Sequence, residues 1–267
     1  MADFVNLERH GKIALFRFHR PDTLNAIGSI SDCDDIVAAL DGLAQGGNVS
    51  VIIITGSGRA FCSGGDLKAI QERRGIGALD QPVSTRDNYR RGVQRVTKAL
   101  MELELPTIAA INGAAVGLGL DLACLCDMRL AAKDARMAAS FIRVGIAPGD
   151  GGAWILPRTI GYAKAAELFF TGATFGADEA LAMGLVSRVV APERLIEEAL
   201  ELAEQIAAHP PRALRLTKRL LTLGRHQSYD DVLELSAAFQ AIVHETDDHR
   251  EAVEALLEKR KPVFTGH

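Results

Sequence analysis

The chain has little cysteine, no surplus of positive charge and no long apolar run. Its 267 residues include four cysteines, 30 Lys and Arg, and 34 Asp and Glu, which gives a formal net charge of −4 at pH 7. Without a basic surplus, neither nucleic acid nor an anionic membrane surface is expected as the main partner. No uncharged apolar run reaches the ~18 residues of a membrane span, and no secretory signal is recognisable. We therefore expect a cytoplasmic protein without a membrane span.

Two kinds of cofactor site are also missing from the sequence. The segment Cys124-Leu125-Cys126 has the wrong spacing for a zinc knuckle, and no second pair of Cys or His completes one. The segment Gly117-Leu118-Gly119 lacks the third glycine of a dinucleotide fingerprint, and no convincing ribose-binding acid follows it. We expect reduced cysteines in the core, no metal and no separate cofactor.

Two glycine-rich turns, each following an apolar run, are the most informative features that are present. The first follows residues 51–55 and contains Ser63-Gly64-Gly65-Asp66, and the second follows residues 107–111 and contains Gly117-Leu118-Gly119. Glycine lets a ligand approach main-chain N–H groups closely, and a helix that starts after the turn adds partial positive charge. Two such turns that converge would form a two-donor hole for a developing oxyanion.

Apolar periodicity predicts strands separated by helices over most of the chain. Such spacing indicates parallel β/α units with right-handed crossovers. From residue 193 onward the pattern is helical, with few strand formers. We therefore predict an α/β core over residues 1–192 and a helical C-terminal region over residues 193–267. The expected elements are a hairpin in 5–18, helices near 29–44, within 66–103 and from about 117, strands at 50–55, 107–111 and 127–132, and further turns of the pattern ending at 142–146 and 187–190.

Several further motifs share the order and spacing of one known family. They are Arg20-Pro21 with Asn25-Ala26, residues 60–67, 110–113 and 117–119, Cys126-Asp127-Met128-Arg129, residues 145–148, and Leu156-Pro157-Arg158. Together they resemble the crotonase superfamily, also called the enoyl-CoA hydratase/isomerase family, over nearly the whole chain. The resemblance implies a crotonase-like spiral of ββα turns with a C-terminal helical trimerisation region, assembled as a homotrimer or hexamer. It also implies an acyl-CoA thioester substrate and a thioester enolate intermediate.

The resemblance further implies roles for individual residues. The main-chain N–H groups of Gly65 and Leu118 fall on the family's oxyanion-hole positions, where a backbone donor leaves the side chain at 118 free to be leucine. A lysine ammonium suits a phosphate as a point charge, although a solvated surface lysine is the alternative for Lys68 and Lys259. The implied CoA-binding residues are Leu24, Ala26, Gly65, Asp66, Leu67, Lys68, Leu118 and Lys259, the last often reaching a neighbouring subunit.

The acid/base residues depart from the family's pattern. Family hydratases commonly use two glutamates, whereas this chain has Asp121 at the first position and Phe141, which cannot move a proton, at the second. Asp150 lies in Pro148-Gly149-Asp150-Gly151, a loop where some family isomerases and some carbon–carbon bond hydrolases of cyclic diketones place an acid. Asp121 and Asp150 are therefore the candidate acids. The alternatives are an ion pair between Asp121 and an arginine such as Arg143, and helix capping by Asp150.

The expected activity is that of an enoyl-CoA hydratase or a Δ3-Δ2 enoyl-CoA isomerase of fatty acid metabolism. An isomerase tolerates Phe141 better, because one carboxylate can shuttle a proton between two carbons. Two alternatives stay open. One is a crotonase-type hydrolase of a β-dicarbonyl substrate, and the other is a non-catalytic acyl-CoA binder that retains the fold.

Overall fold

Two sheets of mostly parallel strands form the body of the protein. A computed structural model describes residues 4–77 and 81–267. The larger sheet has the order β1-β2-β3-β5-β7-β10, and the smaller has the order β4-β6-β8-β9. Only β1 and β9 run antiparallel to their neighbours. The strands are β1 (Val5–His10), β2 (Ile13–Phe18), β3 (Val51–Gly56), β4 (Ala60–Cys62), β5 (Thr107–Ile111), β6 (Ala114–Val116), β7 (Met128–Ala132), β8 (Arg136–Ala138), β9 (Thr174–Gly176) and β10 (Arg188–Val190).

The strands alternate between the two sheets in a repeating turn. Strands β3, β5 and β7 of the larger sheet are followed by β4, β6 and β8 of the smaller sheet, and a helical segment then leads to the next turn. Strands β3 and β5 are buried along their whole length, as parallel strands covered on both faces are. The predicted spiral of ββα turns is therefore confirmed, as are the hairpin β1–β2 and the strands at 51–56, 107–111 and 128–132.

Helices cover the body and link its turns. Ser29 caps α1 in a reciprocal arrangement with Asp32, which explains why that helix begins where the sequence indicates. Residues 140–144 form a 3-10 turn that ends at Gly145 in the left-handed region, while β10 ends the last turn. The helices are α1 (Ile30–Gln45), α2 (Leu67–Gln71), α3 (Pro82–Arg91), α4 (Val93–Glu102), α5 (Leu118–Leu125), α6 (Gly152–Ile160), α7 (Tyr162–Thr171) and α8 (Ala177–Ala182).

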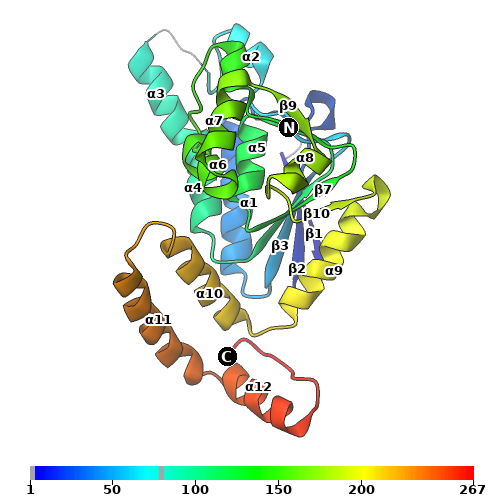
Figure 1. Cartoon of the computed structure of the whole chain (residues 1–267), viewed down its shortest axis with the longest axis vertical. Helices are drawn as coiled ribbons and strands as arrows, with labels where there is room; N and C mark the ends of the chain where they lie inside the picture. The colour runs from blue at the N-terminus through cyan, green and yellow to red at the C-terminus, as the bar shows by residue number, and fades with distance from the viewer. Residues whose placement is uncertain (1–3, 78–80) are drawn as a thin grey trace.

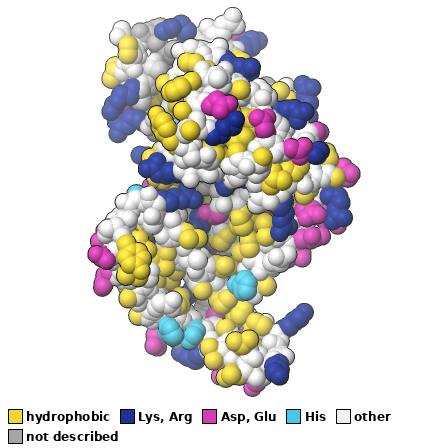
Figure 2. Space-filling view, viewed as in Figure 1, with side chains coloured by type: hydrophobic (Ala, Val, Ile, Leu, Met, Phe, Trp, Pro, Cys, Tyr) yellow, Lys and Arg dark blue, Asp and Glu magenta, His cyan; other side chains and the backbone are white. Residues whose placement is uncertain are grey.

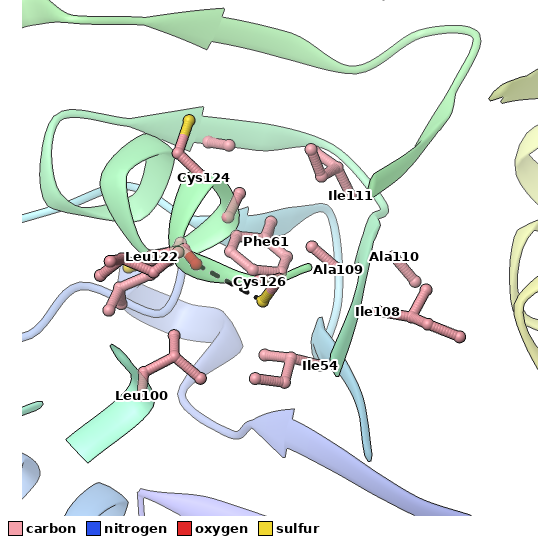
Figure 3. Packing of buried hydrophobic residues seen from close by; sticks show 14 of the residues in the cluster. Ile54, Phe61, Leu100, Ile108, Ala109, Ala110, Ile111, Leu122, Cys124 and Cys126 are labelled. Atoms are coloured by element: carbon pink, nitrogen blue, oxygen red, sulfur yellow. Dashed lines mark hydrogen bonds between the residues drawn. The ribbon is translucent and has the colours of Figure 1, made fainter. Parts of the chain in front are cut away.

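One continuous hydrophobic core joins the sheets to the central helix α5. Every residue of α5 is buried, and it packs against α4 and α6. Side chains from β3, β4, β5 and α5, among them Ile54, Phe61, Ile108 and Leu122, lie together in this core (Figure 3). The start of α5 is consequently held in place by the core, apart from the side that faces the cavity between the glycine-rich turns.

The C-terminal helices differ in how they meet the body: the first packs across its larger sheet, the second is held to it by the buried Lys218, and the last two extend away. Helix α9 (Leu195–Ala207) contacts β2, β3, β5 and β7, whereas α10 (Pro211–Leu223), α11 (Tyr229–His244) and α12 (Asp247–Glu258) lie beyond the sheet (Figure 1). None of the residues of α11 is buried. Figure 2 shows hydrophobic side chains over the part of the molecule that these helices form. Within residues 4–77 and 81–267, no helix has the length and hydropathy to cross a membrane.

Candidate active site

A cavity of about 300 Å³ lies where the two glycine-rich turns meet. One wall is the turn after β4, and another is the start of α5. Helices α3 and α4 and the segment 140–150 complete it. Residues that line it include Gly64, Gly65, Leu67, Tyr89, Gly117, Leu118, Phe141, Arg143 and Asp150.

The two turns are in direct backbone contact. A Cβ atom on Gly64 would lie 2.6 Å from the carbonyl oxygen of Val116 and 3.5 Å from the amide nitrogen of Leu118. A Cβ atom on Gly119 would overlap the carbonyl oxygen of Cys62. Glycine at these positions therefore lets the end of the first turn lie directly against the beginning of α5.

Gly65 and Leu118 both line this cavity. Around Gly65, Ile27 N–H donates to the Gly64 carbonyl at 2.8 Å and Asp66 N–H donates to the Ile27 carbonyl at 3.3 Å. In the described part of the chain, neither the Gly65 nor the Leu118 amide donates a hydrogen bond. Leu118 is the first residue of α5, where N–H groups have no acceptor within the helix and carry the partial positive charge of its end. The site thus offers two available backbone donors.

Asp121 and Asp150, far apart in sequence, form a buried pair of carboxyl groups. Asp121 is 0% exposed and Asp150 is 4% exposed. The two lie within hydrogen-bond reach of one another. Burial, followed by the charge of Asp150, raises the pKa of Asp121 well above its usual range. Burial also raises the pKa of Asp150, while the hydrogen bond with Asp121 acts in the opposite direction.

Of the two structural alternatives for these acids, the ion pair between Asp121 and Arg143 is not formed. The N-cap of α6 is Gly151, which has no capping side chain, and the Asp150 carboxyl lies close to the Gly152 backbone N–H at the start of this helix. Arg143 instead donates to the Thr174 hydroxyl at 3.4 Å, and no ion pair between it and Asp121 is formed. No described cationic side chain therefore forms an ion pair with Asp121 or Asp150.

Phe141 forms an apolar part of the cavity wall. Its side chain is 8% exposed and lines the cavity, with its ring centroid 6.3 Å from that of Phe169. A Cβ atom on Gly117 would lie 3.7 Å from the Phe141 ring, so this ring faces the start of α5. The only described carboxyl groups on the cavity wall are those of Asp66 and Asp150.

The predicted CoA-binding residues are only partly brought together. Asp66 caps α2 by accepting from the Lys68 and Ala69 amides, and Leu67 lines the cavity with an exposed side chain. Lys68 is exposed and outside the cavity wall. Leu24 and Ala26 also lie outside it, although the Leu24 carbonyl accepts a hydrogen bond from the Ser63 amide at 3.0 Å.

Lys259 lies away from the cavity of its own chain. It is exposed and directly follows α12, which lies at the opposite end of the molecule from α2 (Figure 1). Within a single chain, therefore, Lys259 and the cavity are not brought together.

The described residues contain neither a reactive cysteine nor a candidate metal site. Burial raises the pKa of Cys62 and Cys124 to about 12, so both stay protonated and unreactive at neutral pH. All four cysteines are free and buried. Within the described ranges, no cluster of three or more His, Cys, Asp or Glu could hold a metal ion.

Comparison with known proteins identifies the family. A family profile described as enoyl-CoA hydratase/isomerase matches residues 8–267. The chain belongs to the enoyl-CoA hydratase/isomerase family. It is 34% identical to a short-chain-enoyl-CoA hydratase of Clostridium acetobutylicum, over 96% of this chain and 95% of that protein. It is 31% identical to a 1,2-epoxyphenylacetyl-CoA isomerase of Escherichia coli, over 100% of both. The crystal structure of an enoyl-CoA hydratase from Bacillus anthracis superposes with a TM-score of 0.91, at 33% identity, over 99% of this chain and 100% of that chain.

The structure adds two residues to this family member's site that the sequence reasoning missed. Tyr89 lines the cavity, and burial together with the charge of Asp150 raises its pKa. Gly152 lies against Asp121, because a Cβ atom there would overlap the carboxyl group. The glycine pair at 151–152 was a visible signal for the second residue. Tyr89 had no such signal, since it lies in an ordinary amphipathic helix.

Proposed function

We propose that this chain binds an acyl-CoA thioester and stabilises its enolate in an oxyanion hole formed by the N–H groups of Gly65 and Leu118. The observation that carries the proposal is that Gly65, Leu118 and Asp150 line one cavity and that neither amide is used in a described backbone hydrogen bond. An enolate concentrates negative charge on the thioester oxygen, so two fixed donors stabilise it more than they stabilise the neutral carbonyl. Each such donor contributes about 2.7–4 kcal/mol to the transition state.

The proposed reaction is the isomerisation of a 3-enoyl thioester to a 2-enoyl thioester. The Asp150 carboxylate removes a proton from C2, and the electron pair of that C–H bond delocalises onto the thioester oxygen as a dienolate. The proton then returns from Asp150 to C4, and the double bond moves from C3–C4 to C2–C3. No water, oxidant or further cofactor is consumed. Hydration would need a second group to activate water, and Phe141 occupies that position.

Product analysis on matched substrates tests this proposal. The protein is incubated separately with a 2-enoyl-CoA and a 3-enoyl-CoA, and the products are resolved by chromatography and mass spectrometry. Isomerisation leaves the mass unchanged, whereas hydration adds one water. Asp150→Asn should lower turnover by about 10²–10⁴-fold, the usual contribution of general acid–base catalysis. Tight acyl-CoA binding without turnover would instead favour a non-catalytic binder.

A second candidate is a hydrolase of a β-dicarbonyl substrate. The position of Asp150 in Pro148-Gly149-Asp150-Gly151 supports it, because the matching loop carries an acid in that class. Release of a carboxylic acid from a cyclic diketone, with no conversion of either enoyl-CoA, would support the hydrolase and exclude the isomerase.

We also propose that the chain assembles through α10–α12 as a homotrimer or hexamer. Large apolar side chains on these helices are exposed in the single chain, and an assembly could bring Lys259 to the CoA phosphate of a neighbouring site. Mass photometry should give a trimer or hexamer for the parent and smaller species for Leu256→Glu/Leu257→Glu. The exposed apolar residues of this surface are Leu221, Tyr229, Leu233, Ile242, Val253, Leu256, Leu257 and Val263.

A cytoplasmic location and a role in fatty acid metabolism complete the proposal. Four free cysteines and no disulfide among the described residues suit a reducing compartment. Cell fractionation tests the location. A series of straight-chain enoyl-CoA substrates of increasing length tests the metabolic role.

A further inference from the structure

The two buried carboxyl groups differ in what they can touch. Asp150 lines the cavity between the glycine-rich turns, and it also lines a second cavity bounded by Met101, Leu125 and Trp154. Asp121 lines neither cavity and is fully buried in α5. A substrate in the cavity can therefore meet Asp150 but not Asp121.

The Asp121 carboxyl has two neighbours, the Asp150 carboxyl and the backbone of Gly152. Among the described residues, no N–H or O–H donor forms a hydrogen bond with either of its carboxyl oxygens, and one oxygen of Asp150 is likewise buried without a donor. Gly152 packs so closely that any side chain there would overlap the Asp121 carboxyl. Two buried carboxylates within hydrogen-bond reach cannot both be ionised at low cost, so the pair retains one proton. The carboxyl group with no access to solvent or substrate is the better place for that proton.

We propose that Asp121 is a positioning residue that stays protonated and donates its hydroxyl hydrogen bond to the Asp150 carboxylate, which alone exchanges protons with substrate. This inference rests on the proposed function for the identity of the substrate. The protonation of Asp121 and Asp150 does not depend on it. The hydrogen bond fixes the Asp150 carboxylate and stabilises its charge, so Asp150 is ready to accept a proton.

The groups around the pair are compatible with this state. Thiols and a phenol that face it are neutral, because burial raises the pKa of Cys62 and Cys124 to about 12 and, with the Asp150 charge, raises that of Tyr89. The remaining titratable or charged side chains that share a cavity with Asp150 are Asp66, Lys98, Arg143 and His226. None of these forms an ion pair with Asp150 among the described residues.

Amide substitutions at the two positions separate the roles. In Asp121→Asn the side chain is neutral, nearly isosteric and still a donor, as the protonated acid is. We expect this variant to keep kcat within about tenfold of the parent, while Asp150→Asn loses about 10²–10⁴-fold. Equal losses in the two variants would show that Asp121 itself moves the proton and would overturn the proposal.

The pH profile of the reaction and an infrared measurement can separate the two possible roles of Asp121. Neither would change if Asp121 served only to stabilise the fold. In Asp121→Leu the donor is gone, so the pKa of Asp150 rises and the acidic limb of kcat/KM moves up by about one to two pH units, while Asp121→Asn leaves that limb in place. Isotope-edited infrared spectroscopy of carbon-13 aspartate-labelled protein detects the protonated carboxyl directly, without substrate. Its C=O band should be present in the parent at pH 7 and absent in Asp121→Asn.

The infrared measurement tests the protonation of Asp121 by itself. It remains valid if the proposed reaction is wrong or if Asp121→Leu does not fold. A missing band in the parent, or a band that persists in Asp121→Asn, would refute the shared proton. If the band behaves as expected but no enoyl-CoA is converted, the pair stands and the proposed function falls.

Discussion

Replacing Leu118 by proline would remove one amide donor of the proposed oxyanion hole while keeping a residue that suits the first position of α5. Leu118 is the first residue of α5, and its N–H has no acceptor within the helix. Proline is favoured at this first position because its missing N–H is not needed there and its fixed φ suits the helix. The preceding residue is Gly117, which has φ +53 and no Cβ atom to clash with the proline ring.

The expected loss follows from the charge that the missing donor would have stabilised. Removal of one oxyanion-hole donor costs about 2.7–4 kcal/mol of transition-state stabilisation, which corresponds to about 10²–10³-fold in kcat. The leucine side chain is 4% exposed, and its loss alone costs about 2–5 kcal/mol of folding stability. Leu118→Ala is the matched control, because it loses the side chain but keeps the N–H.

Steady-state isomerisation of a 3-enoyl-CoA, with thermal unfolding of each variant, measures the effect. We expect Leu118→Pro to fall about 10²–10³-fold below Leu118→Ala in kcat. Substrate affinity should change much less, because the ground-state carbonyl carries no full charge. If the two folded variants turn over at similar rates, the Leu118 amide does not stabilise the enolate and the oxyanion hole is misplaced.

Three further substitutions test other parts of the structure. Gly152→Ala should lower kcat at least ~10-fold, because the added methyl group displaces the Asp121 carboxyl and a small misplacement can have a large effect on rate. An unchanged kcat would contradict the close contact between Gly152 and Asp121. Phe141→Glu should raise the ratio of hydration to isomerisation, measured on paired enoyl-CoA substrates, because it adds a group able to activate water; a constant ratio would count against this reasoning. Lys218→Met should destabilise the protein by about 3–5 kcal/mol in urea unfolding, because it leaves Asp127 without its buried partner. The Lys218 ammonium lies 2.9 Å from the Asp127 carboxylate. If the free energy of unfolding falls by less than ~1 kcal/mol, the ion pair contributes little to stability.

Local signals in the sequence account for most of the fold. The start of α1 at Ser29, the β1–β2 hairpin and the fully apolar strand β3 each depend on neighbouring residues, and the structure has all three. Helix α9 shows what local signals leave out. Its amphipathic pattern predicts a helix, but only the structure shows that it packs on the larger sheet while α10–α12 do not.

The part of the site that the two glycine-rich turns form could be predicted from the sequence. Glycine at 64 and 119 indicates close approach, and the structure places those turns against each other. The pairing of Asp121 with Asp150 could not be predicted, because one lies in α5 and the other in the loop before α6. Nothing in either local sequence reports the distance between two such elements. Both acids were found as single candidates, whereas their interaction is what raises the pKa of Asp121 most after burial.

The position of Phe141 and the carboxyl pair together define the chemistry that this site supports. Two carboxyl groups on opposite sides of a substrate can act at once, one on water and one on carbon. Here Phe141 and Asp150 both line the cavity, whereas Asp121 is buried and does not line it. This carboxyl pair offers the substrate one carboxylate, that of Asp150. One carboxylate that first accepts a proton and then returns it is what a 1,3-proton shift requires, so the arrangement favours moving a double bond over adding water to it.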